Sequence, residues 1–95
     1  MQKILIADDE AKIRRIIRDF LTAKGFETVE AEDGAQALHV FAENSDIALA
    51  VLDIMMPEMN GWEVCRKIRE TSDVPVIFLT GRGGGFDEPE GLKWG

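Results

Sequence analysis

The stretch IALAVLDIMMPEMNG, residues 47–61, decides the fold because it joins an apolar strand to a turn through a single acid. Its first part is almost entirely apolar, which is typical of a central parallel strand covered on both faces. Asp53 closes that strand, and Pro57, Asn60 and Gly61 then supply residue types that favour a turn. The stretch therefore predicts a buried parallel strand that ends in a carboxylate.

Strand and helix patterns alternate on both sides of this stretch. We expect further strands at 3–8, 26–31 and 74–80, and helices at 9–25, 33–45 and 62–70. In the first helix, apolar residues recur three and four positions apart, which indicates one buried face. The residues expected to face inward on the three helices are Ile13, Ile16, Ile17, Phe20, Leu21, Ala37, Leu38, Phe41, Ala42, Val64, Cys65 and Ile68. Such alternation implies right-handed crossovers and predicts an α/β fold with a doubly wound parallel sheet.

Composition narrows the class of protein. A chain of 95 residues suits one small domain. Its 18 acidic and 11 basic residues give a net charge of -7, which disfavours direct binding to nucleic acid. Cys65 is the single cysteine, so a reducing cytoplasm is favoured over a disulfide framework. No apolar run approaches the roughly 20 residues of a membrane span. We expect a soluble cytoplasmic domain without a membrane segment.

Three acids and a hydroxyl follow the predicted strands. Asp8 and Asp9 end the first strand, Asp53 the third and Thr80 the fourth. The carboxyl ends of parallel strands meet at one edge of a sheet, so these residues should lie close together. Like charges so placed repel, which raises a carboxyl pKa or calls for a cation. Mg²⁺ prefers such oxygen ligands and often keeps positions open for phosphate.

Such an edge could also carry phosphoryl chemistry. A carboxylate at a strand tip beside Mg²⁺ can attack phosphorus and form an aspartyl phosphate. Thr80 could then donate its hydroxyl to a phosphoryl oxygen. Each residue also has a simpler interpretation: Asp8 or Asp9 as a helix N-cap, Asp53 as a turn former and Thr80 as a strand-end hydroxyl. The combination is more specific than its parts.

Three segments, ILIADDE, LAVLDIMMPEMNGWEVCRKIR and VPVIFLT, strongly resemble the receiver domain of bacterial two-component response regulators. The resemblance covers about residues 3–82 in the order and spacing of that family. It is strongest to regulators that carry a winged-helix DNA-binding domain, and such a domain is not part of this sequence. The resemblance implies a flavodoxin-like sheet, in which Pro57 and Gly61 shape the loop after the third strand.

The resemblance also implies roles for individual residues. Asp53 would accept a phosphoryl group from a histidine kinase. Asp8, Asp9, Asp53 and the backbone carbonyl of Met55 would hold Mg²⁺, with Asp9 as a direct ligand. Thr80 would be the hydroxyl that moves towards the phosphoryl group. The chain would be a phosphoacceptor and not an enzyme.

The sequence departs from the family pattern after Thr80. We divide the chain into a receiver core, 1–80, and a glycine-rich, altered fourth-helix region and tail, 81–95. Glycines and Pro89 disfavour a regular helix there, so we expect a shortened or irregular helix around 86–94. The residues expected to anchor it are Phe86, Leu92 and Trp94.

The family's fifth strand, its phosphoryl-contacting lysine and its fifth helix would fall beyond residue 95, and Lys93 is not that lysine. We therefore expect four strands in the order 2-1-3-4, with the fourth, 74–80, as an open edge. An apolar edge strand is a template for pairing with another chain.

The alternative to a signalling phosphoacceptor is thus a truncated or engineered receiver fragment. Such a fragment would form a homodimer or domain-swapped oligomer through the fourth strand. It would be phosphorylated poorly or not at all. A phosphatase of another aspartyl-phosphate family is disfavoured, because DIMM lacks a second acid two residues after Asp53.

Overall fold

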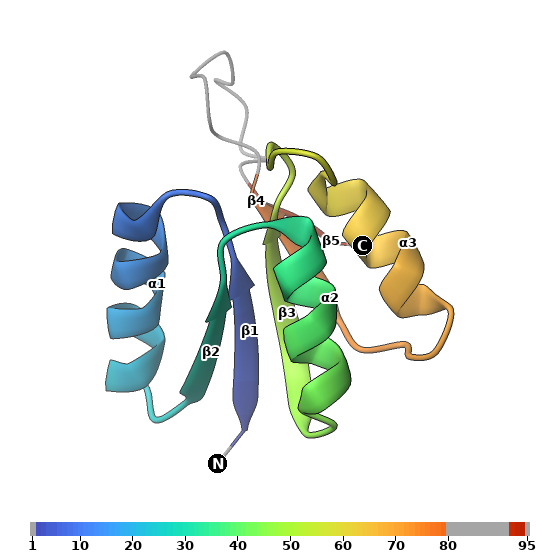
Figure 1. The fold of residues 1–95 in the computed structure, drawn as a ribbon. Coiled ribbons are helices and arrows are strands. Elements are labelled where there is room, and N and C mark those ends of the chain that lie inside the picture. The colour runs from blue at the N-terminus through green and yellow to red at the C-terminus, as the bar shows by residue number, and fades with distance from the viewer. Residues whose placement is uncertain (1, 80–91, 95) are drawn as a thin grey trace.

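The computed structural model describes residues 2–79 and 92–94, and the statements below concern these residues. The elements are β1 Lys3–Ala7, α1 Ala11–Ala23, β2 Glu27–Ala31, α2 Gly34–Glu43, β3 Ile47–Asp53, α3 Gly61–Arg69, β4 Val76–Leu79 and β5 Leu92–Trp94 (Figure 1). They form one sheet in the order β2-β1-β3-β4-β5, and the pairs among the first four strands are parallel. This arrangement confirms the predicted doubly wound sheet with the order 2-1-3-4.

The two faces of the sheet carry different helices. Successive residues of a strand point to opposite faces, so β1 contributes to two separate apolar clusters. Leu5 belongs to a large cluster that includes Ile68 of α3, whereas Ile6 belongs to a smaller cluster against which Ile17 of α1 packs. Helices α2 and α3 therefore cover one face, and α1 lies on the other (Figure 1).

Local capping explains the starts of α2 and α3 and the end of α1. The Asn60 side chain accepts a hydrogen bond from the Glu63 amide and the Glu63 side chain accepts one from the Asn60 amide, both at 3.0 Å, which makes a capping box for α3. Asp33 caps α2 by accepting from the Gln36 amide at 2.7 Å. After α1, Gly25 takes a φ of +94°, a left-handed conformation that favours glycine and ends the helix.

The outer part of the α1 face is not covered. Ile16 is 57% exposed and Phe20 is 61% exposed, although both were predicted to face inward. They border an apolar groove of about 390 Å³ lined by Ile16, Ile17, Phe20, Leu21, Leu49, Val51, Ile77 and Leu79. The prediction is wrong for these two residues because α1 covers β1 while no second helix in the described ranges covers β3 and β4 on this face. Ala42 of α2, also predicted inward, is exposed.

The edge of β4 is not open. β5 pairs antiparallel with β4, in the register Ile77 with Trp94 and Leu79 with Leu92. This pairing corrects the expected open fourth strand, and the strand at 92–94 corrects the expected helix there. The physical reason is that pairing with residues 92–94 satisfies backbone N–H and C=O groups that an open edge strand would leave exposed. The predicted boundary at 80/81 and residue Phe86 lie outside the described residues.

None of the helices in the described part of the chain has the length and apolar character needed to cross a membrane.

Candidate functional site

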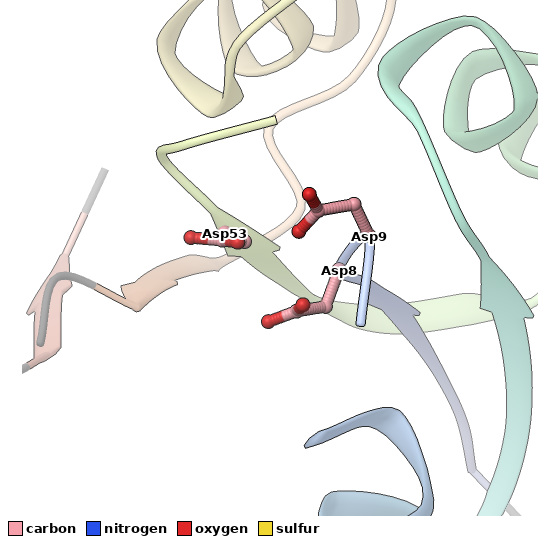
Figure 2. A group of neighbouring side chains, drawn as sticks. All are labelled: Asp8, Asp9 and Asp53. Carbon is pink, nitrogen blue, oxygen red and sulfur yellow. The ribbon is translucent and has the colours of Figure 1, made fainter. Parts of the chain in front are cut away.

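The carboxyl ends of β1 and β3 bring the predicted acids together. Ala7 lies opposite Leu52 in the parallel register, so the residues that follow, Asp8 and Asp53, leave adjacent strands at the same level. Asp9 comes one residue later, and Figure 2 shows the three side chains gathered at this edge of the sheet. Each can offer a carboxylate oxygen such that all three oxygens lie within 4.8 Å of one another. The structure thus places the three acids as the sequence predicts.

Burial makes it costly for the carboxylates of this cluster to be ionised. Asp8 is 1% exposed and Asp53 is 0% exposed, while Asp9 lies at the surface. An ionised carboxylate loses hydration on burial, and two neighbouring carboxylates also repel. A hard divalent cation relieves both costs, and an all-oxygen donor set suits Mg²⁺. The residues present therefore fit such a cation.

Backbone amides orient the two buried carboxylates. Oδ1 of Asp8 accepts a hydrogen bond from the Glu10 amide at 2.8 Å, and Oδ1 of Asp53 accepts one from the Met55 amide at 3.1 Å. Asp8 thereby fixes the turn into α1, for which Glu10 is the N-cap residue. These hydrogen bonds hold the two carboxyl groups in place at the carboxyl ends of β1 and β3.

The loop after β3 packs closely against Asp53. The Gly61 amide donates to the Ile54 carbonyl at 3.1 Å, which folds the loop back onto the end of the strand. A Cβ atom on Gly61 would stand 2.6 Å from the Asp53 carbonyl oxygen, closer than real Cβ contacts come. Glycine is therefore required at this position for close approach, in line with the loop-shaping role that the resemblance implies.

The structure does not test the predicted roles of two site residues, Met55 and Thr80. The Met55 amide binds Asp53, whereas the ligand role of the Met55 carbonyl stays a prediction. Thr80 lies outside the described residues. Leu79, which precedes it, is paired with Asp53 in the register of β3 and β4.

Sequence reasoning did not identify Arg14 as a residue near the site. Its Nη1 donates to the Asp8 carbonyl at 2.7 Å, and its Nε donates to Glu30 Oε1 at 3.1 Å. Periodicity locates the apolar face of a helix but does not tell which polar side chain reaches a neighbouring turn. The sequence held no signal that could have found this contact.

Residues 4–95 match the family described as "Response regulator receiver domain". The chain belongs to this family. That match confirms the resemblance inferred from the three sequence segments, and the site just described is the acidic edge of a receiver domain.

Curated relatives of this receiver domain are transcriptional regulators. It is 47% identical over 94 residues to the probable transcriptional regulator ycf27 of Pyropia yezoensis, covering 99% of this chain and 38% of that protein. It is 39% identical over 95 residues to the transcriptional regulatory protein CpxR of Escherichia coli, covering 100% of this chain and 40% of that protein. The chain thus spans about two fifths of the length of these relatives.

Solved structures of receiver domains share the fold. The response regulator TrrA of Thermotoga maritima, solved in complex with Mg²⁺ and BeF, has a TM-score of 0.81 and 38% identity, covering 87% of this chain and 72% of that chain. A receiver domain protein of Clostridium thermocellum also has a TM-score of 0.81, with 34% identity, covering 87% of this chain and 68% of that one. Both likenesses confirm the flavodoxin-like class of the sheet.

Proposed function

We propose that this receiver domain accepts a phosphoryl group on Asp53 from a histidine kinase, with Mg²⁺ bound beside it. The observation that carries the proposal is the cluster of Asp8, Asp9 and Asp53, whose carboxylate oxygens can lie within 4.8 Å of one another. The domain is consumed in the transfer and regenerated later, so it is an acceptor and not an enzyme.

The transfer uses the carboxylate of Asp53 as the nucleophile. One of its oxygens forms a bond to phosphorus while the phosphorus–nitrogen bond of a phosphohistidine breaks. The electron pair of the broken bond stays on the imidazole nitrogen, which takes up a proton from water. The product on this chain is an acyl phosphate. The Met55 amide, already bonded to Oδ1, orients the carboxylate throughout.

The cation would be held by Asp8, Asp9 and Asp53, together with the carbonyl of Met55. Bound Mg²⁺ supplies neutralisation of the negative charge on the transferring group. The complex of TrrA with Mg²⁺ and BeF supports this choice by similarity. Thr80 is proposed as the hydroxyl that contacts the phosphoryl oxygens.

The proposal can be tested with beryllofluoride, which imitates a phosphoryl group. Amide NMR spectra of the chain are recorded with Mg²⁺ alone and then with Mg²⁺ and beryllofluoride. We expect the Met55 and Glu10 amides to shift, because both donate to carboxylates of the site. The variant Asp53→Asn should not respond to beryllofluoride. Asp73→Asn is the matched control, since Asp73 is an exposed acid before the opposite end of β4.

The partners and setting of the domain follow as further parts of the proposal. A histidine kinase is the phosphodonor, and the cytoplasm is the compartment in which the two meet. The net charge of -7 supports a domain that does not itself bind DNA. The names of the relatives state that they regulate transcription. Such control by this protein would need parts of a protein other than this receiver domain.

Self-association is the second candidate, and one observation favours it. The apolar groove beside α1 is bordered by the exposed side chains of Ile16 and Phe20. We propose that a second copy covers this face, with the Phe20 ring of each copy entering the groove of the other. The edge of β4 does not serve as the contact, because β5 already pairs with it. Light scattering should give a dimer that Phe20→Ser converts to a monomer. A monomer for the unaltered chain at high micromolar concentration contradicts this candidate.

A further inference from the structure

Arg14 connects α1 to the acidic edge of the sheet. Its side chain is 16% exposed, and its guanidinium spans two partners on different segments. Nη1 donates to the Asp8 carbonyl at 2.7 Å, and Nε donates to Glu30 Oε1 at 3.1 Å. A planar guanidinium holds two acceptors in fixed directions, so the arginine ties the end of β1 to β2.

The peptide group that Arg14 binds is the one that leads to Asp9. The carbonyl of Asp8 and the amide of Asp9 lie in one rigid peptide plane. A hydrogen bond to that carbonyl therefore also fixes the position of the Asp9 Cα atom, from which the Asp9 side chain extends. On its other side, the Asp8 amide donates to the Ala31 carbonyl at 3.1 Å. The backbone of Asp8 is thus held at both its amide and its carbonyl.

Glu30 fixes Arg14 in turn. It lies in β2 opposite Ile6 of β1, and its second oxygen accepts from Arg18 Nη1 at 3.5 Å. A rigid strand therefore carries a carboxylate that two arginines of α1 share. The connection runs from Glu30 through Arg14 to the Asp8–Asp9 peptide.

We propose that Arg14 is a positioning residue that sets the affinity of the acidic cluster for a divalent cation by holding the Asp8–Asp9 peptide. The inference rests on the proposed function, because it assumes that the cluster binds Mg²⁺. Mg²⁺ demands near-octahedral ligand geometry, so a displaced carboxylate weakens binding. Groups that orient metal ligands typically change metal affinity by about 10-fold to 100-fold when mutated.

The sign of the effect separates positioning from simple electrostatics. A guanidinium near a cation site repels the cation, so loss of its charge alone would strengthen Mg²⁺ binding. Loss of positioning would weaken it. Arg15 provides the matched control, because it is exposed and stands one residue along the same helix. Arg14→Gln and Arg15→Gln remove the same charge, but only the first removes the bond to Asp8.

The experiment is a titration of the whole chain with Mg²⁺ alone, followed by amide NMR shifts, with urea unfolding of each variant in parallel. We expect the Mg²⁺ dissociation constant to rise about 10-fold in Arg14→Gln and to stay equal or fall slightly in Arg15→Gln. Arg14→Lys keeps the charge but cannot bridge both partners, so it should also bind Mg²⁺ more weakly. It serves in place of Arg14→Gln if that variant does not fold.

Each outcome has one meaning. Equal or tighter Mg²⁺ binding in the folded Arg14 variants, relative to Arg15→Gln, overturns the inference and leaves the proposed function intact. No Mg²⁺ binding by the unaltered chain instead contradicts the proposed function, and the inference falls with it.

Discussion

Gly61 lies directly against the carbonyl of Asp53, so that a Cβ on Gly61 would stand 2.6 Å from the Asp53 oxygen. The first residue of α3 and the proposed phosphoacceptor are therefore packed as one unit. A change at Gly61 should reach the site through the backbone of Asp53 and not through any side-chain contact.

We predict that Gly61→Ala destabilises the fold by about 1–3 kcal/mol, the usual cost of overpacking. Phosphorylation of Asp53 should also slow, because the added methyl group pushes the strand end. Gly25→Ala is the control: a Cβ there meets nothing within 4 Å, but the φ of +94° strains the backbone. It should lose stability without slower phosphorylation. Urea unfolding and phosphorylation rates measure the two effects, and equal rates in both variants would refute the link.

The contribution of the α3 capping box to the free energy of unfolding should be measurable by itself. Asn60→Ala removes the acceptor for the Glu63 amide, which costs about 0.5–2 kcal/mol of unfolding free energy. Because Asn60 caps the start of α3, the variant should also fray the first turn of that helix. Hydrogen exchange of the Glu63 and Val64 amides reports the fraying. Unchanged exchange in Asn60→Ala would show that the cap does not hold this end.

Two isoleucines should respond differently to truncation. Ile68 of α3 is 1% exposed, so Ile68→Ala leaves a cavity and should cost about 2–5 kcal/mol. Ile16 of α1 is 57% exposed, so Ile16→Ala should cost less than about 1 kcal/mol in a dilute, monomeric sample. Urea unfolding curves give both values. A cost for Ile16→Ala as large as that for Ile68→Ala would mean that the α1 face is covered in solution.

Mg²⁺ should stabilise the folded chain because it binds the carboxylates that burial and repulsion make costly. At about 100 times its dissociation constant, a ligand of the folded state adds about 2.7 kcal/mol. The melting temperature should therefore rise with Mg²⁺ concentration. Asp9→Asn should blunt this rise, while Asp73→Asn should leave it unchanged. A rise of the same size in Asp9→Asn would remove Asp9 from the ligand set.

The sequence predicted the site better than it predicted the surroundings. The run 47–53 matches β3 residue for residue, and its end at Asp53 was clear because turn-forming residues follow the acid at Pro57, Asn60 and Gly61. Parallel topology then sufficed to bring Asp8 beside Asp53. Both predictions depend on chain order and on the position of an acid after an apolar run, which a sequence displays directly.

What could not be predicted depends on longer-range packing. Leu49 was expected to be covered on its face of the sheet, but it lies half-buried beside the groove, since an apolar residue does not reveal whether a helix will pack on it. Strand β5 arises in a segment without periodicity, so no pattern distinguished it from an irregular helix. The bond from Arg14 to Asp8 depends on the reach of one side chain, which periodicity does not describe.

The central claim is that Asp53 accepts a phosphoryl group at this edge of the sheet. The most direct measurement is the intact mass of the chain after incubation with acetyl phosphate and Mg²⁺. We predict a gain of one phosphoryl group for the unaltered chain and for Asp73→Asn, and none for Asp53→Asn. An unaltered chain that gains no mass, or an Asp53→Asn variant that gains as much, would contradict the account.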